Sequence, residues 1–156
     1  ISLEEDKELF WEELWTIVLK EIKGKSRIFQ KPIKGKNRKY IISGEKNCYY
    51  TMSVSIKKKE VTVKLDFNNM KKTENNIYAF EKMHEAKKTI EGKFGNNLIW
   101  YDIEDQDIKS IQYVEHFNGF ETESEKAHLV DFYVKNIVLL EEATREVLKS
   151  VNMNLK

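Results

Sequence analysis

Apolar side chains recur at helical spacing near both ends of the chain and at alternating positions in its middle. Between positions 10 and 22 the apolar residues repeat every three or four positions, which is the period of an amphipathic helix. Ser2 and Glu5 form a capping-box pattern at the expected start of this helix, and Gly24 follows its expected end. We therefore predict a first helix that ends at about Lys23.

Two segments in the middle of the chain alternate apolar and polar residues, as half-buried strands do. Residues 50–56 and 61–67 each carry four apolar residues at every second position, and the short connection Lys57–Glu60 predicts an antiparallel hairpin between them. Tyr40–Ile42 is a third candidate strand. The preceding polar stretch, residues 24–39, is interpreted as a long loop because Pro32 and Gly35 interrupt it, with one short strand considered at Ile28–Phe29.

The second half of the chain repeats the change from helix to strand to helix. Helical spacing predicts a second helix over residues 75–93, and Gly95 suits the left-handed position that follows a helix end. Leu98–Ile103 and Lys109–Phe117 are rich in β-branched and aromatic residues and predict a second hairpin. Thr122 and Glu125 form another capping box, which begins a last helix running to about residue 152 and roughly 45 Å long.

These elements define an α+β fold with the order α-β-β-β-α-β-β-α, in which an antiparallel sheet is packed by three helices and the C-terminal helix is long. The 156 residues fit one domain. Because the chain begins at Ile1 instead of Met, we interpret it as a fragment of, or a companion to, a larger protein.

The charge is distributed very unevenly, although the whole chain carries a net charge of only +1. Residues 23–72 contain fifteen bases and three acids, a net charge of +12, whereas the segments on either side are acidic. Phosphate contacts from lysine and arginine supply most non-specific affinity for nucleic acid. The candidate nucleic-acid-binding residues are Lys23, Lys25, Arg27, Lys31, Lys34, Lys36, Arg38, Lys39, Lys57, Lys58 and Lys59.

Two features qualify that prediction. Phe29 and Tyr40 interleave with the bases and could stack on nucleobases if they are exposed. Lysine greatly outnumbers arginine, which favours contact with the phosphate backbone over recognition of base edges. The alternative is that these lysines are simply solvated or form ion pairs with the acidic helices, and the sequence alone leaves both interpretations open.

The last helix offers a second kind of interaction, because its apolar residues cover more than one face. One interpretation is that it lies under the sheet and also packs against the first helix, through Trp11 and Trp15. The other is that it forms a homodimer or docks a partner domain. A protein-interaction or dimerisation module is therefore the first alternative function.

A magnesium-dependent nuclease is the second alternative, because such enzymes use converging carboxylates and a lysine. The candidates for that role are Asp66, Asp102, Glu104, Asp105, Asp107 and Lys109. No nucleotide-binding motif is present, and His84, His116 and His128 lack zinc-like spacing, so we predict no catalytic site, no bound metal and no cofactor. The single cysteine, Cys48, and the absence of a membrane-length apolar run favour a cytoplasmic protein without membrane contact.

Residues 90–100 read Ile-Glu-Gly-Lys-Phe-Gly-Asn-Asn-Leu-Ile-Trp, a pattern in which a helix ends and a strand begins. The pattern, together with Phe10-Trp11 in the first helix and the long last helix, resembles a prokaryotic domain-of-unknown-function family. In that family the domain often follows a restriction-endonuclease-like nuclease domain, which implies a role near DNA, in defence. The resemblance carries over no catalytic residue. The same motif also has a structural interpretation as a packing corner, since Ile90 and Phe94 share one helix face.

Overall fold

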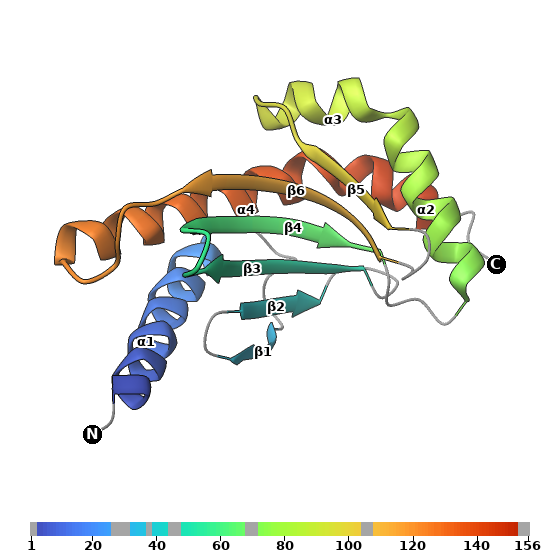
Figure 1. Ribbon diagram of the computed structural model, residues 1–156. Helices are drawn as coiled ribbons and strands as arrows, with labels where there is room; N and C mark the ends of the chain where they lie inside the picture. Colours follow the sequence, from blue (N-terminus) through green and yellow to red (C-terminus); the bar gives the residue numbers. More distant parts are fainter. Residues whose placement is uncertain are drawn as a thin grey trace.

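The computed structural model describes residues 3–25, 32–36, 39–43, 48–67, 72–103 and 108–152 of the chain. These residues form four helices and six strands (Figure 1). Along the chain they are α1 (Leu3–Lys23), β1 (Pro32–Lys36), β2 (Lys39–Ser43), β3 (Tyr49–Ser55), β4 (Glu60–Asp66), α2 (Thr73–Glu85), α3 (Lys87–Phe94), β5 (Ile99–Ile103), β6 (Ile108–His116) and α4 (Glu123–Asn152).

The six strands form one antiparallel sheet in the order β1-β2-β3-β4-β6-β5. Strands β1 to β4 are neighbours in sequence, and the chain then passes through α2 and α3 before β5 and β6 complete the far edge (Figure 1). The predicted hairpins pair as expected, with Val54 opposite Val61 in the first and Trp100 opposite Ile111 in the second. The α+β class, the antiparallel sheet and the long C-terminal helix are confirmed.

Helix α4 runs along one face of the sheet and is also contacted by the other three helices (Figure 1). The hydroxyl of Tyr133 donates to the carbonyl of Ser53 over 2.7 Å, and the hydroxyls of Tyr50 and Thr144 are 2.7 Å apart. Contacts within the chain on several sides explain why apolar residues cover more than one face of this helix. The interpretation in which α4 lies under the sheet and packs against α1 is confirmed.

Two element predictions differ from the structure. Residues 32–36 form strand β1 where a loop was predicted; β1 is an edge strand, the position in which a sheet tolerates proline. The helix predicted over residues 75–93 is divided at Ala86, whose backbone N–H donates to Met83. The apolar spacing continues through this break, so periodicity could not reveal it. The candidate strand at Ile28–Phe29 lies outside the described residues, as does Ser2 of the first capping box.

The second capping box forms as its sequence predicts. The backbone N–H of Glu125 donates to Oγ1 of Thr122, and the N–H of Thr122 donates to Oε1 of Glu125, both over 3.1 Å. Gly119 passes close to the same carboxylate, because a Cβ at this position would lie 2.3 Å from Oε2 of Glu125. Because glycine has no side chain, position 119 leaves space for the capping carboxylate of Glu125.

The motif at residues 90–100 is a packing corner, as its structural interpretation predicts. Ile90 and Phe94 are buried, and Gly95 adopts the left-handed conformation, with φ of 91°, that ends α3. The carboxylate of Glu91 then accepts a hydrogen bond from the backbone N–H of Leu98 over 2.7 Å, which fixes the direction of the chain entering β5. The spacing of apolar residues in this segment therefore follows from a helix-to-strand connection.

Candidate nucleic-acid interface

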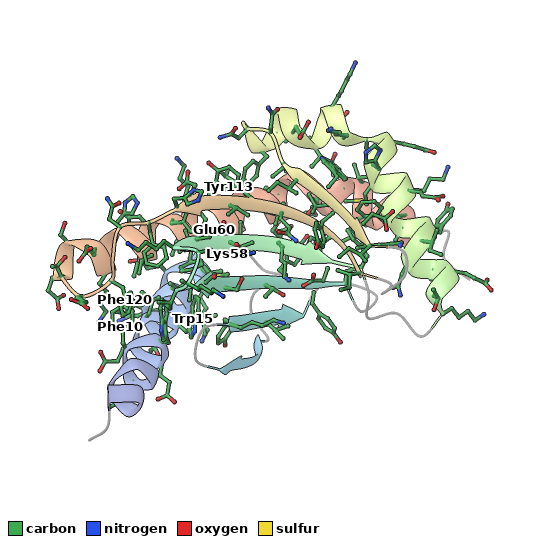
Figure 2. The ribbon with its side chains drawn as sticks, in the orientation of Figure 1. Phe10, Trp15, Lys58, Glu60, Tyr113 and Phe120 are labelled. Carbon is green, nitrogen blue, oxygen red and sulfur yellow. The ribbon has the colours of Figure 1, made fainter. Side chains whose placement is uncertain are left out.

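Five of the predicted nucleic-acid-binding residues meet at one end of the sheet, which we call the basic end: Lys36, Lys39, Lys57, Lys58 and Lys59. Lys36 ends β1 and Lys39 begins β2, and the two form a cross-strand pair. The three consecutive lysines occupy the turn between β3 and β4, and Figure 2 labels the middle one, Lys58. The side chains of Lys39, Lys57, Lys58 and Lys59 are exposed, and for Lys36 the backbone alone is described.

The sheet register brings these two turns together. Lys39 is paired with Ser53 on β3, and β3 continues only two residues further, to Ser55, before the turn begins. At 3.4 Å per residue, the second turn therefore starts about 7 Å beyond the first. Because the strands are antiparallel, the pair Lys36 and Lys39 and the β3–β4 turn lie at the same end of the sheet, where β1 ends and β2 begins in Figure 1. Segments that are separated by some twenty residues in the sequence thus form one cationic edge.

The exposed lysines of the basic end have no ion pair with any carboxylate among the described residues. The nearest acid along the chain is Glu60, whose Oε1 lies 3.9 Å from Nε2 of His116 on the adjacent strand. Lysines that are not engaged by the protein keep their charge available for an external anion. The interpretation in which they pair with the acidic helices therefore has no support in the described part of the chain.

Tyr40 cannot contribute the base stacking that its place among the bases suggested. It is only 7% exposed, and its ring lies 6.0 Å from that of Trp15 on α1. The residue before it, Lys39, is exposed because side chains alternate across a strand. The other candidate for stacking, Phe29, lies outside the described residues.

The remaining predicted binding residues are not assembled at this edge by the described structure. Lys23 and Lys25 are exposed at the end of α1, where Lys25 lines a cleft together with Val138 and Leu139 of α4. Of Lys34 the backbone alone is described, within β1. Three further residues lie outside the described part of the chain: Arg27, Lys31 and Arg38.

Lys59 has a backbone conformation that is unusual for its residue type. Its φ is 54°, in the left-handed region where glycine and asparagine are common and lysine is not. Its N–H donates to the carbonyl of Ile56 over 3.3 Å, and its own carbonyl accepts from Phe117 over 2.9 Å. The turn is therefore held by its neighbours in a conformation that costs about 1 kcal/mol for a residue with a Cβ.

The carboxylates proposed for a magnesium site do not converge where they are described. Asp66 is paired with Ser110, whereas Asp102 is paired with Lys109, the preceding residue of β6. Since successive residues of a strand point to opposite faces, Asp66 and Asp102 lie on opposite faces of the sheet.

Each of these carboxylates also has a partner of its own. Asp66 accepts a hydrogen bond from Thr51 over 2.9 Å, and Asp102 accepts one over 2.8 Å from the buried ammonium of Lys109. The other members of the set, Glu104, Asp105 and Asp107, lie outside the described residues. Among the described side chains, no group of three or more histidine, cysteine, aspartate or glutamate residues is placed to hold a metal ion.

The structure also contains a polar cavity of about 360 Å³, which the sequence did not predict. It lies between the end of α3, the last residues of β6 and the first half of α4, and its ionisable lining residues are Glu115, His128, Asp131 and Lys135. The spacing of the last three places them on one side of α4, which is a weak signal that any solvated helix can give. Glu115 joins them only through the fold, so no sequence pattern could have singled it out.

Taken together, the fold and the basic end define an α+β protein whose antiparallel sheet is covered on one face by helices and carries lysine-rich turns at one end. The chain belongs to the family described as "Domain of unknown function (DUF4268)", whose model matches residues 7–148. No curated protein and no solved structure matches it. Within the described residues, no helix has both the length and the apolar character needed to cross a membrane.

Proposed function

We propose that this chain is a non-catalytic auxiliary domain that contacts the phosphate backbone of nucleic acid through the basic end, and that it works beside a nuclease in prokaryotic defence. The observation that carries the contact is the meeting of two lysine-rich turns at one end of the sheet, with exposed ammonium groups that no described carboxylate engages. The link to a nuclease rests on the family resemblance of residues 90–100.

Lysine is a suitable residue for this kind of contact. Its ammonium is a flexible point charge that binds phosphate without the planar geometry that arginine brings to base edges. A cluster at the end of a rigid sheet can follow a backbone in which charges recur every few ångströms. We therefore expect binding that depends strongly on salt and little on sequence.

The first test replaces Lys57, Lys58 and Lys59 by glutamine and measures affinity for DNA and RNA as a function of salt. We expect the slope of log affinity against log salt to fall by about 3, because each phosphate contact contributes roughly one unit. At 0.1 M salt, loss of three contacts should weaken binding on the order of 100-fold or more. Fluorescence anisotropy with labelled single-stranded and double-stranded oligonucleotides provides the measurement.

A matched control removes the same charge elsewhere. Lys82, Lys87 and Lys88 lie on α2 and α3, away from the basic end, and their replacement by glutamine changes the net charge equally. This control should retain most of the affinity and most of the salt slope. The proposal fails if the parent chain does not bind at low salt, or if both triple variants lose the same affinity.

A second prediction separates affinity from stability at one residue. Replacing Lys59 by glycine should raise the free energy of unfolding by about 0.5–1 kcal/mol, because glycine adopts positive φ without steric cost. The same change should weaken nucleic-acid binding several-fold, because one phosphate contact is removed. Urea denaturation and anisotropy on the same preparation measure the two effects, and a loss of both stability and affinity would contradict the assignment of strain.

No described feature favours the alternative of dimerisation through α4. Most of its apolar side chains are buried against the sheet and the other helices; among them Ile137 and Leu140 are fully buried. Val138 and Leu139 are partly exposed where they line the cleft beside Lys25, so the described part of α4 leaves a small apolar surface there.

A further inference from the structure

The cavity between α3, β6 and α4 is open because β5 is shorter than β6. Strand β5 begins opposite Gln112, so residues 113–116 of β6 have no β5 partner. Tyr113 and Glu115 line the cavity from this stretch of β6 (Figure 2 labels Tyr113). Phe94 closes one side from the end of α3, and α4 supplies the opposite wall. A volume of about 360 Å³ lies in the range of small-ligand sites.

Aromatic rings form the inner surface of this cavity. The rings of Phe94 and Tyr113 are 5.0 Å apart and meet edge to face, and those of Tyr113 and Phe132 are stacked at 6.2 Å with an interplanar angle of 17°. Each of the three residues lines the cavity. A flat or cationic group that enters it would therefore contact aromatic surface.

In the cavity, the hydroxyl of Tyr113 is hydrogen-bonded to the side chains of both Glu115 and Asn96. The hydroxyl of Tyr113 donates to Oε1 of Glu115 over 2.6 Å and accepts a hydrogen bond from the side-chain amide of Asn96 over 3.3 Å. The hydrogen bond to Glu115 is the main reason why the pKa of Tyr113 is raised. This arrangement fixes the carboxylate of Glu115, whose Oε2 has no hydrogen-bond partner among the described residues.

The remaining polar groups are rich in hydrogen-bond acceptors. Asn136 is only 7% exposed; its amide nitrogen donates to the carbonyl of Phe132, and its amide oxygen has no donor among the described residues. Asp131 is exposed at the rim and has no ion pair with a described cation. With Glu115, the cavity therefore offers two carboxylates and the amide oxygen of Asn136, against the ammonium of Lys135 and the imidazole of His128.

We propose that this cavity binds a guanidinium group, held by Glu115, Asp131 and Asn136 and packed against the aromatic rings. Guanidinium is planar, carries five N–H donors and stacks on aromatic faces, so it matches the surplus of acceptors and the flat apolar surface. Its charge offsets the excess of carboxylate over ammonium in the lining. The group comes either from a small organic guanidinium compound or from an arginine side chain of a peptide.

The test titrates the chain with N-ethylguanidinium and, as a neutral molecule of the same shape, N-ethylurea. Backbone amide chemical shifts of Gly95 and Asn96, which line the cavity, report binding at the site. We expect saturable shifts with the guanidinium compound and at least tenfold weaker binding of the urea. Glu115→Gln and Asp131→Asn should each weaken guanidinium binding about tenfold, whereas Glu142→Gln, an equal change of charge on an exposed residue of α4, should not.

A second arm identifies the source of the group. A capped Gly-Arg-Gly tripeptide that binds at least tenfold more tightly than N-ethylguanidinium indicates a peptide arginine, and equal affinities indicate a small compound. Circular dichroism confirms that the variants are folded. The proposal is overturned if neither guanidinium ligand gives saturable shifts, if the urea binds equally well, or if Glu115→Gln and Asp131→Asn both leave the affinity unchanged.

Discussion

Replacing Trp15 by alanine should lower the free energy of unfolding by about 4 kcal/mol, within the range seen for buried tryptophan truncations. Trp15 is 3% exposed and lies where α1, α4 and the sheet meet. Its ring is 4.9 Å from that of Tyr133 on α4, 6.0 Å from that of Tyr40 on β2 and 5.9 Å from that of Trp11, which in turn packs against Phe10 and Phe120. Alanine would leave a cavity that three packed elements cannot easily close.

The effect of this substitution should extend to the basic end. Tyr40 packs against Trp15, and the preceding residue of β2 is Lys39, so loosening β2 should also weaken the proposed nucleic-acid binding. Chemical denaturation with urea measures the loss of stability. Ile17→Ala, on the same helix but at a side chain that is 39% exposed, should cost less than 1 kcal/mol. Equal losses in the two variants would show that Trp15 does not anchor α1.

The parts of the fold that the sequence predicted are those that depend on local chemistry. The alternation in residues 50–56 and 61–67 gave the β3–β4 hairpin, and the pair Thr122 and Glu125 gave the start of α4. Strand β1 escaped prediction because its sequence, Pro-Ile-Lys-Gly-Lys, has neither alternation nor strong β-propensity and forms through pairing with β2. The break at Ala86 was equally hidden, since the buried side chains on either side keep helical spacing.

In the candidate site, too, features that depend on neighbouring residues could be predicted, whereas features that depend on strand pairing could not. That lysines are concentrated in residues 23–72 is visible in the sequence, but their positions relative to one another are set by strand register. Strand register also places Asp66 and Asp102 on opposite faces of the sheet. The number and order of carboxylates in the sequence do not predict this placement. Tyr40 was misjudged for a related reason: the run Tyr40–Ile42 is apolar throughout, so it gives no indication of which side faces the core.

The protein should lose stability steeply as the pH rises above about 10, the ordinary pKa of a tyrosine hydroxyl. Burial raises the pKa of Tyr50 and of Tyr133 well above that value. In the unfolded chain both hydroxyls ionise near pH 10, whereas in the folded chain both stay protonated, so the unfolded state binds fewer protons and becomes favoured. The expected loss is about 1.4 kcal/mol per pH unit for each tyrosine, or about 2.7 for the pair.

Below pH 10 both hydroxyls are protonated in either state, so these two residues should contribute no pH dependence there. Urea denaturation at half-unit steps from pH 9 to about 11.5 measures the slope, and absorbance of tyrosinate follows ionisation directly. Of the seven tyrosines, two should ionise only as the helical circular dichroism signal is lost. The double variant Tyr50→Phe and Tyr133→Phe should start less stable, because hydrogen bonds to Thr144 and Ser53 are removed, yet show a flatter alkaline slope. An unchanged slope in that variant would place the alkaline instability elsewhere in the chain.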